Sequence, residues 1–436
     1  MPEPLQVKAL TLNCWGLWMI SQKRRERIEA LAVELKKGRW DIVSIEELWV
    51  RDDFEHIKQA CEDVLPYAHD FAGGMIGSGC CVFSRWPIVD VGYSKFTLNG
   101  FPHRLDHCDW YGGKLVGMCV IQKDEYRIQI YTTHMHAMYA PSHQPAKDQY
   151  SSHRITQSYE LSEYARQTSA DADLVLVMGD LNSEPHSLSF KVIHKNSDVL
   201  DSWETRLNKD EKFDILSEAM GNTIETRENS HTDLGHLHYP IFPNGIRIDF
   251  ILYKAGRNRT VNCTEARVAL SRKIPGTDMN YSDHNGYEAF FELREQTEKE
   301  RLEELSKDED LESKINVLND LYQKIHTARI QGHASKKFNI AAFLVGFFLL
   351  LMIFISAFWD TSTLRGVMAS ILVSMGWFYS AYRLIFVFGT VNTLRNVEDS
   401  IYLRREHFLR RAEELKAKSR FPTYDLKTEP IIAEDV

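Results

Sequence analysis

The chain has 436 residues, of which 44% are hydrophobic and 26% charged, a balance that excludes a disordered or fibrous protein. Its formal net charge is −9, so no overall basic charge attracts nucleic acid. Its seven cysteines form no CxxC pair and no disulfide-like framework, which favours a reducing compartment. The first residues lack a basic stretch followed by an apolar run, so we expect no cleaved signal peptide.

Residues 1–294 alternate short β-rich segments with segments of helical periodicity. Apolar, β-branched runs bounded by turn residues predict strands over 7–13, 41–45, 80–84, 115–121, 127–133, 174–178, 248–253 and 289–293. Apolar residues three and four positions apart predict helices over 24–37 and 151–168. Residues 205–240 are polar and weakly periodic, so we expect a loop with local helix there. The alternation predicts one mixed α/β domain.

The composition changes abruptly after residue 294. Residues 295–337 are dense in charge, but they carry apolar side chains at a 4-3-4-3 spacing from Leu311 to Ile325. Residues 392–436 repeat a similar rhythm, for example at Leu394 and Ile401, before a polar tail. These two stretches would lie side by side if the sequence between them folds back on itself. We therefore expect an antiparallel helical stalk, with two independent solvated helices as the alternative.

Two apolar runs separate these stretches. Residues 338–358 contain no charge and would form a helix about 31 Å long, close to the thickness of a bilayer core. A second run, 367–391, is interrupted only by Arg383. The short linker suits a transmembrane hairpin, with a pair of buried core helices as the alternative. Basic residues at the outer ends, such as Lys336 and Lys337, predict that both termini face the cytosol.

Polar side chains occur repeatedly where the predicted strands end. They are Asn13, Glu47, His134, Asp180, Asn182, Asp249, Asp283 and His284. A single carboxylate at a strand end is more often a helix cap or a turn residue. The ordered set, however, indicates an active site, because layered α/β folds collect catalytic groups at strand ends.

This set of residue types suits metal-assisted hydrolysis of a phosphodiester. Hard oxygen ligands such as Glu47 and Asn13 are typical of Mg²⁺ sites, and the lack of a Cys/His cluster argues against zinc. A histidine would then activate water, and we assign this role of general base to His284, directly after Asp283. The remaining roles are hypotheses on the same footing. Asp249 would hold the other nitrogen of His284, Asp180 and Asn182 would orient water and a phosphate oxygen, and His134 would donate to a phosphoryl oxygen or to the departing alkoxide.

The motifs LNCW, EE, TH, GDLN, RID and SDH occur in this order within residues 5–293. As a set they resemble the endonuclease/exonuclease/phosphatase superfamily, which is related to DNase I. The resemblance implies a four-layer αββα sandwich of two mixed sheets and a dependence on Mg²⁺ or Mn²⁺. The metal-binding glutamate of that family falls on Glu47, and many members have Gln where Glu46 stands. Its Asp–Asn pair falls on Asp180 and Asn182, and its base falls on His284.

Further motifs narrow the resemblance. LNCWG, IGSGCCVFSRWPI, FTLNG, DWYGGKLVG and THMHA are similar to neutral sphingomyelinases, in particular the smaller type with a C-terminal pair of membrane spans. In these enzymes an Asp and a Lys five residues apart precede the central strands, and Asp109 and Lys114 match that spacing. The resemblance implies that Lys114 approaches the phosphodiester and that its pairing with Asp109 opens and closes the site. The alternative is a surface ion pair of little energetic weight.

The resemblance implies hydrolysis of sphingomyelin to ceramide and phosphocholine. A lysophospholipid phospholipase C that releases phosphocholine from lysophosphatidylcholine is the nearest alternative. A nuclease of the same fold is disfavoured by the acidic charge and the hairpin, so we expect no nucleic-acid partner. An inositol-lipid phosphatase would need a basic cluster that the motifs lack, and a catalytically dead scaffold would not need the polar set.

The hairpin predicts an integral membrane protein with two spans and a cytosolic catalytic domain. The endoplasmic reticulum, the Golgi and the plasma membrane all remain open, because hydrophobic length alone does not separate them. Basic residues next to the spans would attract an anionic lipid activator. Loop residues such as Trp18, Met19 and Ile20 would either lean into the membrane interface or belong to the core. The oligomeric state is left open.

Overall fold

The computed structural model describes residues 3–140, 147–234, 242–306, 310–357 and 364–417. The predicted tail beyond residue 417 and most of the predicted linker between the two apolar runs lie outside the described residues.

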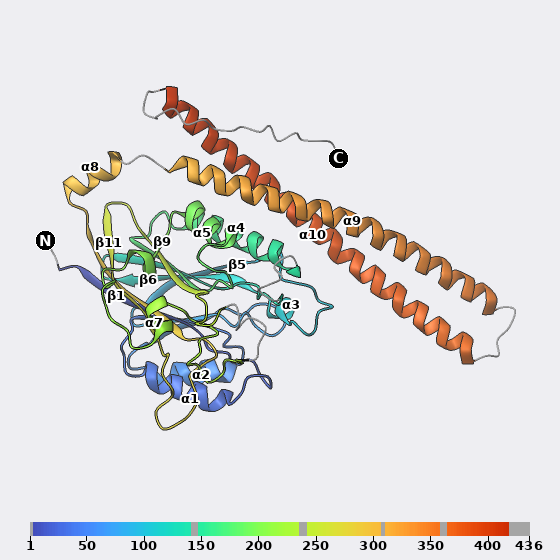
Figure 1. Cartoon of the computed structure of the whole chain (residues 1–436), viewed down its shortest axis with the longest axis horizontal. Helices are drawn as coiled ribbons and strands as arrows, with labels where there is room; N and C mark the ends of the chain where they lie inside the picture. The colour runs from blue at the N-terminus through green and yellow to red at the C-terminus, as the bar shows by residue number, and fades with distance from the viewer. Residues whose placement is uncertain (1–2, 141–146, 235–241, 307–309, 358–363, 418–436) are drawn as a thin grey trace.

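Two six-stranded mixed sheets form the centre of the catalytic region (Figure 1). The first sheet has the order β11-β12-β1-β2-β4-β3, and the second has the order β5-β6-β7-β8-β10-β9. Each sheet contains one parallel pair, β1 with β2 and β7 with β8, among antiparallel neighbours. The bounds of the first sheet are β1 Leu5–Asn13, β2 Ile42–Glu46, β3 Tyr67–Asp70, β4 Cys81–Ser84, β11 Arg259–Ala269 and β12 Gly286–Glu295. Those of the second are β5 Ile88–Lys95, β6 Leu115–Lys123, β7 Tyr126–His134, β8 Leu174–Asp180, β9 Leu200–Asp201 and β10 Asp249–Ala255.

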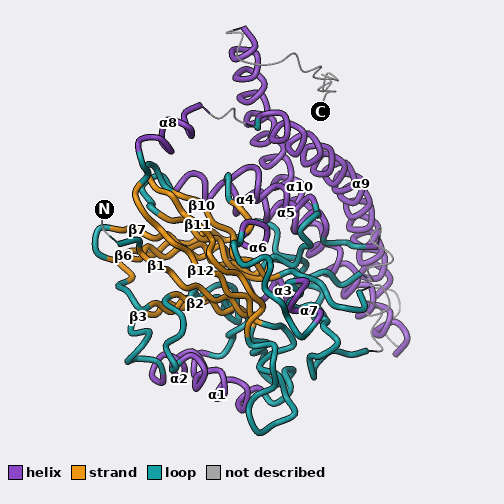
Figure 2. Tube along the Cα trace, turned by 60° about the vertical axis from the view of Figure 1, so that its left-hand side comes forward, coloured by secondary structure: helices purple, strands orange, loops and turns teal. Residues whose placement is uncertain are grey.

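The two sheets pack face to face and are covered by helices on their outer faces. Apolar side chains of both sheets, such as Ile42, Leu176 and Phe291, form one buried core between them. Helices α1 (Arg24–Leu35) and α2 (Arg51–Ala60) pack on the first sheet, and α4 (Ser151–Thr168) and α5 (Leu188–Ser197) pack on the second. Figure 2 shows the two pairs of helices on opposite sides of the strands. The predicted four-layer αββα sandwich is therefore confirmed.

Two further short helices, α6 (Ser202–Thr205) and α7 (Leu216–Met220), lie in the region predicted as loop with local helix or just before it. A third, α3 (Asp109–Gly112), lies in the connection between β5 and β6. The four edge strands, β3, β5, β9 and β11, were not among the predicted strands. Strands β3 and β9 have only four and two residues, and β5 and β11 have many polar or half-exposed side chains, so none of them shows the apolar run of a central strand.

The C-terminal region forms α8 (Glu298–Ser306) and two long helices, α9 (Leu311–Ala357) and α10 (Leu364–Ala417). The expected boundary between stalk and membrane span at residue 337 does not interrupt α9, because no proline or other helix terminator occurs there. Helices α9 and α10 lie side by side (Figure 1). Leu318 and Ile401 belong to one apolar cluster that also includes Ile155 of α4 and Val192 of α5. The stalk helices are thus not independent but pack on each other and on the sandwich.

The apolar portions of α9 and α10 are long enough to cross a membrane and lie outside the protein core. Phe348 and Phe354 on α9 and Phe378 and Ile385 on α10 are 61–69% exposed. The alternative of buried core helices is therefore wrong. Such large apolar surface on two adjacent helices is typical of contact with lipid.

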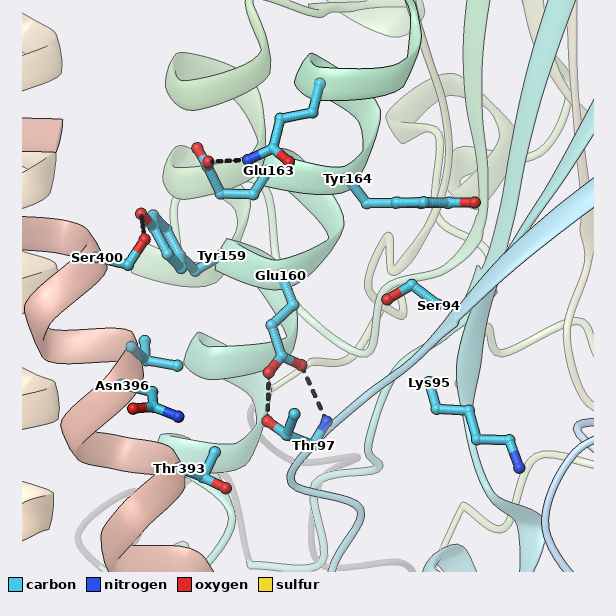
Figure 3. A pocket seen from close by; sticks show the side chains of 12 residues that line it. Ser94, Lys95, Thr97, Tyr159, Glu160, Glu163, Tyr164, Thr393, Asn396 and Ser400 are labelled. Atoms are coloured by element: carbon cyan, nitrogen blue, oxygen red, sulfur yellow. Dashed lines mark hydrogen bonds between the residues drawn. The ribbon is translucent and has the colours of Figure 1, made fainter.

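A cavity of about 350 Å³ lies at the junction of the sandwich and α10 (Figure 3). Glu160 of α4 faces it and accepts hydrogen bonds from the backbone N–H, at 3.1 Å, and from the hydroxyl of Thr97. Tyr159 and Ser400 join the two elements through a hydroxyl–hydroxyl hydrogen bond of 2.8 Å. Burial raises the pKa of Glu160 to about 7, although the bonds from Thr97 oppose this shift.

The raised pKa predicts how Glu160 affects stability at different pH values. A carboxyl whose folded-state pKa exceeds its unfolded value stabilises the fold fully below the unfolded pKa, and this contribution is lost as pH rises through about 7. Glu160→Gln imitates the protonated form, so it should raise the Tm by about 2–4 °C at pH 8 and by less at pH 5. The check is thermal unfolding of the detergent-solubilised protein at both pH values.

Glu163, one helical turn further along α4, is a matched control. Burial raises the pKa of its carboxyl, but hydrogen bonds from Arg166 and Asn196 outweigh this and lower the pKa overall. Both pH values lie above the ordinary carboxyl pKa of 4.5, so Glu163→Gln should lower the Tm by nearly the same amount at pH 8 and at pH 5, in contrast to the pH-dependent gain of Glu160→Gln. Equal shifts of the Tm at both pH values for Glu160→Gln would contradict the assignment of its pKa.

Candidate active site

The ends of the central strands deliver polar side chains to one end of the sandwich. In the second sheet, His134, Asp180 and Asp249 are neighbours across β7, β8 and β10. In the first sheet, Asn13 ends β1 beside Glu46, the last residue of β2. The face-to-face packing of the sheets brings these two sets together.

The polar set lines a pocket of about 280 Å³. The lining includes seven of the ten residues predicted for the site and several apolar neighbours. These residues are Leu17, Glu47, Trp49, Ile76, His107, Cys108, Asp109, Lys114, His134, Tyr139, Asp180, Asn182 and His284. Asn13 and Asp249 are buried and hydrogen-bonded to lining residues. Asp283 does not line the pocket. Its carboxylate is half-buried and accepts a hydrogen bond of 3.1 Å from Ser282.

His284 is held in position by a buried carboxylate. Its Nδ1 lies 2.9 Å from Oδ2 of Asp249, a fully buried side chain, and its Nε2 lies 4.0 Å from Oδ2 of Asp180. Asp249 therefore favours a proton on Nδ1 and leaves Nε2 directed toward Asp180 and the pocket. Burial opposes the charged form of His284, but the charge and hydrogen bond of Asp249 hold the pKa of the imidazole well above its ordinary value.

Asn13 orients two carboxylates rather than presenting its oxygen to the pocket. Its amide nitrogen donates to Oε1 of Glu47 and to Oδ2 of Asp180, each at 3.1 Å. Its amide oxygen accepts from the backbone N–H of Trp15 at 3.1 Å. Of the two residues expected to hold metal, therefore, only Glu47 lines the pocket, and the side chain of Asn13 is fully engaged by other groups.

Glu47 has an unusual backbone conformation, and a glycine at position 16 makes room for its carbonyl group. Glu47 has φ of 59°, in the left-handed region that side chains other than glycine seldom adopt. Its carbonyl accepts from the N–H of Gly16 at 3.0 Å, and a Cβ at Gly16 would stand 2.5 Å from that carbonyl oxygen. The glycine of the LNCWG motif therefore permits the close approach that aims Glu47 at the pocket.

Lys114 is a buried cation that lines the pocket. Its ammonium lies 2.7 Å from Asp109, donates to the carbonyl of Met135 at 2.7 Å and lies 3.1 Å from Nε2 of His134. The side chains of Lys114 and Asp109 are only 3% and 4% exposed, so the alternative of a surface ion pair is wrong. Tyr139, which the sequence did not single out, also donates to Asp109.

The charge of Lys114 sets the protonation of its neighbours. Burial alone would raise the pKa of the Asp109 carboxyl, but Lys114 outweighs this and holds the pKa well below its usual range. Burial, and next the charge of Lys114, lower the pKa of His134 well below its ordinary value. His134 is therefore neutral, and its Nε2 accepts a hydrogen bond from the ammonium of Lys114 rather than donating one.

Asn182 completes the wall beside Asp180. Its backbone N–H donates to Oδ1 of Asp180 at 2.8 Å, and its side-chain amide donates to the carbonyl of Met135 at 3.0 Å. Asn182 adopts φ of 45°, where an asparagine is better tolerated than most residues. The carbonyl of Met135 thus links Asn182 with Lys114, a backbone role that side-chain motifs do not reveal.

Burial keeps part of the acid set protonated near neutral pH. Burial raises the pKa of Glu46 to about 8, and the side chain accepts from the hydroxyls of Thr11 and Ser44 at 3.1 and 2.6 Å. Glu46 is therefore mostly neutral at pH 7 and adds little charge to the site. Burial, and next the charge of Asp249, raise the pKa of Asp180 to about 7.

The donor set fits a hard divalent cation. Burial, and next the charge of Asp283, raise the pKa of Glu47. Burial likewise disfavours the charged form of Asp180, so a cation bound between the two side chains would stabilise both carboxylates in their charged form. Asp180, Asp249 and His284 place one potential ligand atom each within 4.8 Å of the others, the one such group found among the described residues. Nδ1 of His284 is already engaged by Asp249, which leaves the carboxylates of Glu47 and Asp180 as the groups that could hold a divalent cation.

The burial of the Asp109–Lys114 pair predicts a large effect on stability. Lys114→Met leaves the Asp109 carboxylate buried without its cation and should cost about 3–5 kcal/mol in the free energy of unfolding. The double variant with Asp109→Asn and Lys114→Met removes both charges and should regain most of that loss. Thermal unfolding of the solubilised variants is the check, and a double variant as unstable as the single one would contradict the account.

Comparisons with known proteins agree with the fold and the motifs. Residues 10–284 match the model of the Endonuclease/Exonuclease/phosphatase family. Sphingomyelin phosphodiesterase 2 of Homo sapiens is 36% identical over 260 residues, which are 59% of this chain and 58% of the human protein. The chain therefore matches less than two-thirds of the length of that relative. Inositol phosphosphingolipids phospholipase C of Schizosaccharomyces pombe is 29% identical over 66% of this chain and 69% of its own length.

Among solved structures, the sphingomyelinase C of Streptomyces griseocarneus has a TM-score of 0.46 and 17% identity, and the match covers 66% of this chain and 99% of that structure's chain. The family match covers more than half of the chain and includes every strand end that lines the pocket. The chain belongs to the Endonuclease/Exonuclease/phosphatase family.

Proposed function

We propose that the chain is a membrane-anchored, Mg²⁺-dependent phosphodiesterase that hydrolyses sphingomyelin to ceramide and phosphocholine. The observation that carries this proposal is the pocket in which the His284–Asp249 pair faces Glu47, Asp180 and Lys114. The human relative bears the name sphingomyelin phosphodiesterase 2, which supports the choice of substrate. The exposed apolar helices α9 and α10 support the membrane anchor.

In the proposed reaction a water molecule attacks the phosphorus atom of the lipid. Nε2 of His284 takes a proton from this water, while Asp249 keeps the ring in the required tautomer. The bond between phosphorus and the ceramide oxygen breaks, and the departing alkoxide takes up a proton to give ceramide. When bound by Glu47 and Asp180, Mg²⁺ neutralises phosphate charge and stabilises the transition state.

Other side chains position the phosphate. Asp180 and Asn182 orient the attacking water and one phosphate oxygen. The geometry favours Lys114 over His134 as the donor to a phosphoryl oxygen, because the Nε2 atom of His134 accepts from Lys114. Asp109 would hold Lys114 between turnovers and release it when the phosphate arrives.

The proposed organisation assigns a role to each region. Residues 1–294 form the catalytic domain, and residues 295–337 form the stalk. The spans 338–358 and 367–391 form the hairpin, and residues 392–436 form the cytosolic return segment and tail. Lys336 and Lys337 at the stalk end of the hairpin support a cytosolic catalytic domain. The same charges would attract an anionic lipid activator.

The direct test is release of phosphocholine by the detergent-solubilised full chain. We expect release from sphingomyelin in Mg²⁺ and none in EDTA. His284→Ala should lower the rate by about 10⁴-fold or more, because it removes the base. His56→Ala, an exposed histidine on α2, is the matched control and should leave the rate unchanged.

The choice of substrates separates the alternatives. Lysophosphatidylcholine and an inositol phosphosphingolipid are offered beside sphingomyelin. The inositol phosphosphingolipid is included because the fission yeast relative is named for that substrate. Release only from lysophosphatidylcholine would keep the mechanism and change the substrate. Nicking of plasmid DNA without turnover of any lipid would overturn the proposal.

A further inference from the structure

The end of the connection between β5 and α3, together with the first two residues of α3, contacts the apolar part of α10. We call this segment, residues 101–110, the docking loop. The ring of Trp110 lies 6.0 Å from that of Phe386, and the ring of His103 lies 6.1 Å from that of Tyr379, both nearly perpendicular. Burial, and next the charge of Arg383, lower the pKa of His103, which also places this loop beside α10. The catalytic domain therefore contacts the segment that would cross the membrane, not only the stalk.

The docking loop also forms part of the pocket. His107, Cys108 and Asp109 line it, and Asp109 holds Lys114. The imidazole of His107 stacks on the ring of Tyr139 at 3.7 Å, and Tyr139 lines the pocket as well. One short segment thus joins the apolar face of α10 to the mouth of the site.

The position of the contact along α10 corresponds to the edge of a bilayer. Phe386 is 22 residues beyond Leu364, where α10 begins, a distance of about 33 Å along a helix. A bilayer core is about 30 Å thick. On α9 the ammonium of Lys336 lies 3.8 Å from the centre of the Phe388 ring, so a charge stands at the same level. Arg383, about one helical turn before Phe386, is a residue type typical of the interface.

Exposed apolar side chains surround the mouth of the pocket. We call Trp18, Met19, Met75, Ile76, Leu105 and Trp110 the apolar rim, and they are 36–83% exposed. They lie on three loops, each of which also contributes a pocket-lining residue, namely Leu17, Ile76 and His107. In Figure 1 the α3 end of the sandwich lies on the side toward which the α9–α10 hairpin extends. Trp110 lies on α3, so this arrangement supports a rim that faces the membrane that the hairpin would cross.

We propose that the apolar rim is a membrane-binding surface that rests in the near leaflet of the bilayer spanned by α9 and α10. The contact of the docking loop with α10 fixes the pocket at this level and turns its mouth toward the lipid. A phospholipid of the same membrane then presents its phosphodiester to the pocket without leaving the bilayer. The proposal rests on the proposed membrane anchor and adds the place and orientation at which the site works.

Photo-crosslinking to lipid tests the proposal without using activity. A benzophenone side chain is placed at Leu105 or at Leu207, which are 68% and 70% exposed. Leu207 is the matched control, because it lies beside Cys263 in the middle of edge strand β11, away from the pocket. The full chain is reconstituted in phosphatidylcholine vesicles that contain a radiolabelled lipid. We expect about tenfold more labelled lipid on the Leu105 variant.

Equal labelling at the two positions, or crosslinks from Leu105 to a second protein chain in place of lipid, would overturn the proposal. A second measurement compares Leu105→Asp with Leu207→Asp. In vesicles into which the protein is reconstituted, Leu105→Asp should lower the rate of sphingomyelin hydrolysis about fivefold or more. In detergent micelles the rate should change little, because the rim does not have to enter a bilayer. Leu207→Asp should change neither rate.

The failures of the two proposals are distinguishable. Absence of hydrolysis by the unaltered chain in micelles would contradict the proposed function, and the crosslinking would still decide the membrane-binding surface. Normal hydrolysis in micelles together with equal lipid labelling at both positions would contradict the membrane-binding surface alone. An equal loss in micelles and vesicles for Leu105→Asp would also count against it.

Discussion

The structure depends on a cluster of buried acids where the central strands of the two sheets end. Burying charge costs several kcal/mol per ion unless it is neutralised or paired. Three features offset this cost. A proton neutralises Glu46, and the imidazole of His284 hydrogen-bonds to Asp249. The amide of Asn13 donates hydrogen bonds to Glu47 and Asp180. The sandwich serves this cluster, because only face-to-face sheets bring β1 and β2 opposite β8 and β10. The remaining negative charge is what a divalent cation would neutralise.

Much of this architecture follows from the sequence because the central strands are buried on both faces. Their continuous apolar runs end in polar residues, so strands and candidate site residues could be predicted together, and α4 was predicted with the bounds observed. The edge strands β5 and β11 could not, because their outward side chains are polar. The orientation of Asn13 and the carbonyl of Met135 depend on contacts between distant segments, which no local pattern encodes.

The same contrast holds for the C-terminal helices. Composition predicts the apolar runs and the stalk, because both depend on local hydrophobicity and spacing. The sequence does not reveal that α9 continues without interruption or that the docking loop lies against α10 at Phe386. That contact joins residues far apart in the chain, and it connects the acid cluster to the apolar part of α10 through Asp109 and Lys114. The site and the anchor are thus parts of one arrangement.

Binding of Mn²⁺, followed by electron paramagnetic resonance, tests the central claim most directly. The detergent-solubilised full chain should bind one Mn²⁺ that Mg²⁺ displaces. Glu47→Gln should weaken this binding by more than the roughly 10–100-fold typical of losing an outer-shell partner, because in the proposed site Glu47 would contact the cation directly. Unchanged affinity in Glu47→Gln, or no bound Mn²⁺ in the unaltered chain, would contradict the claim that the buried acids are built around a cation.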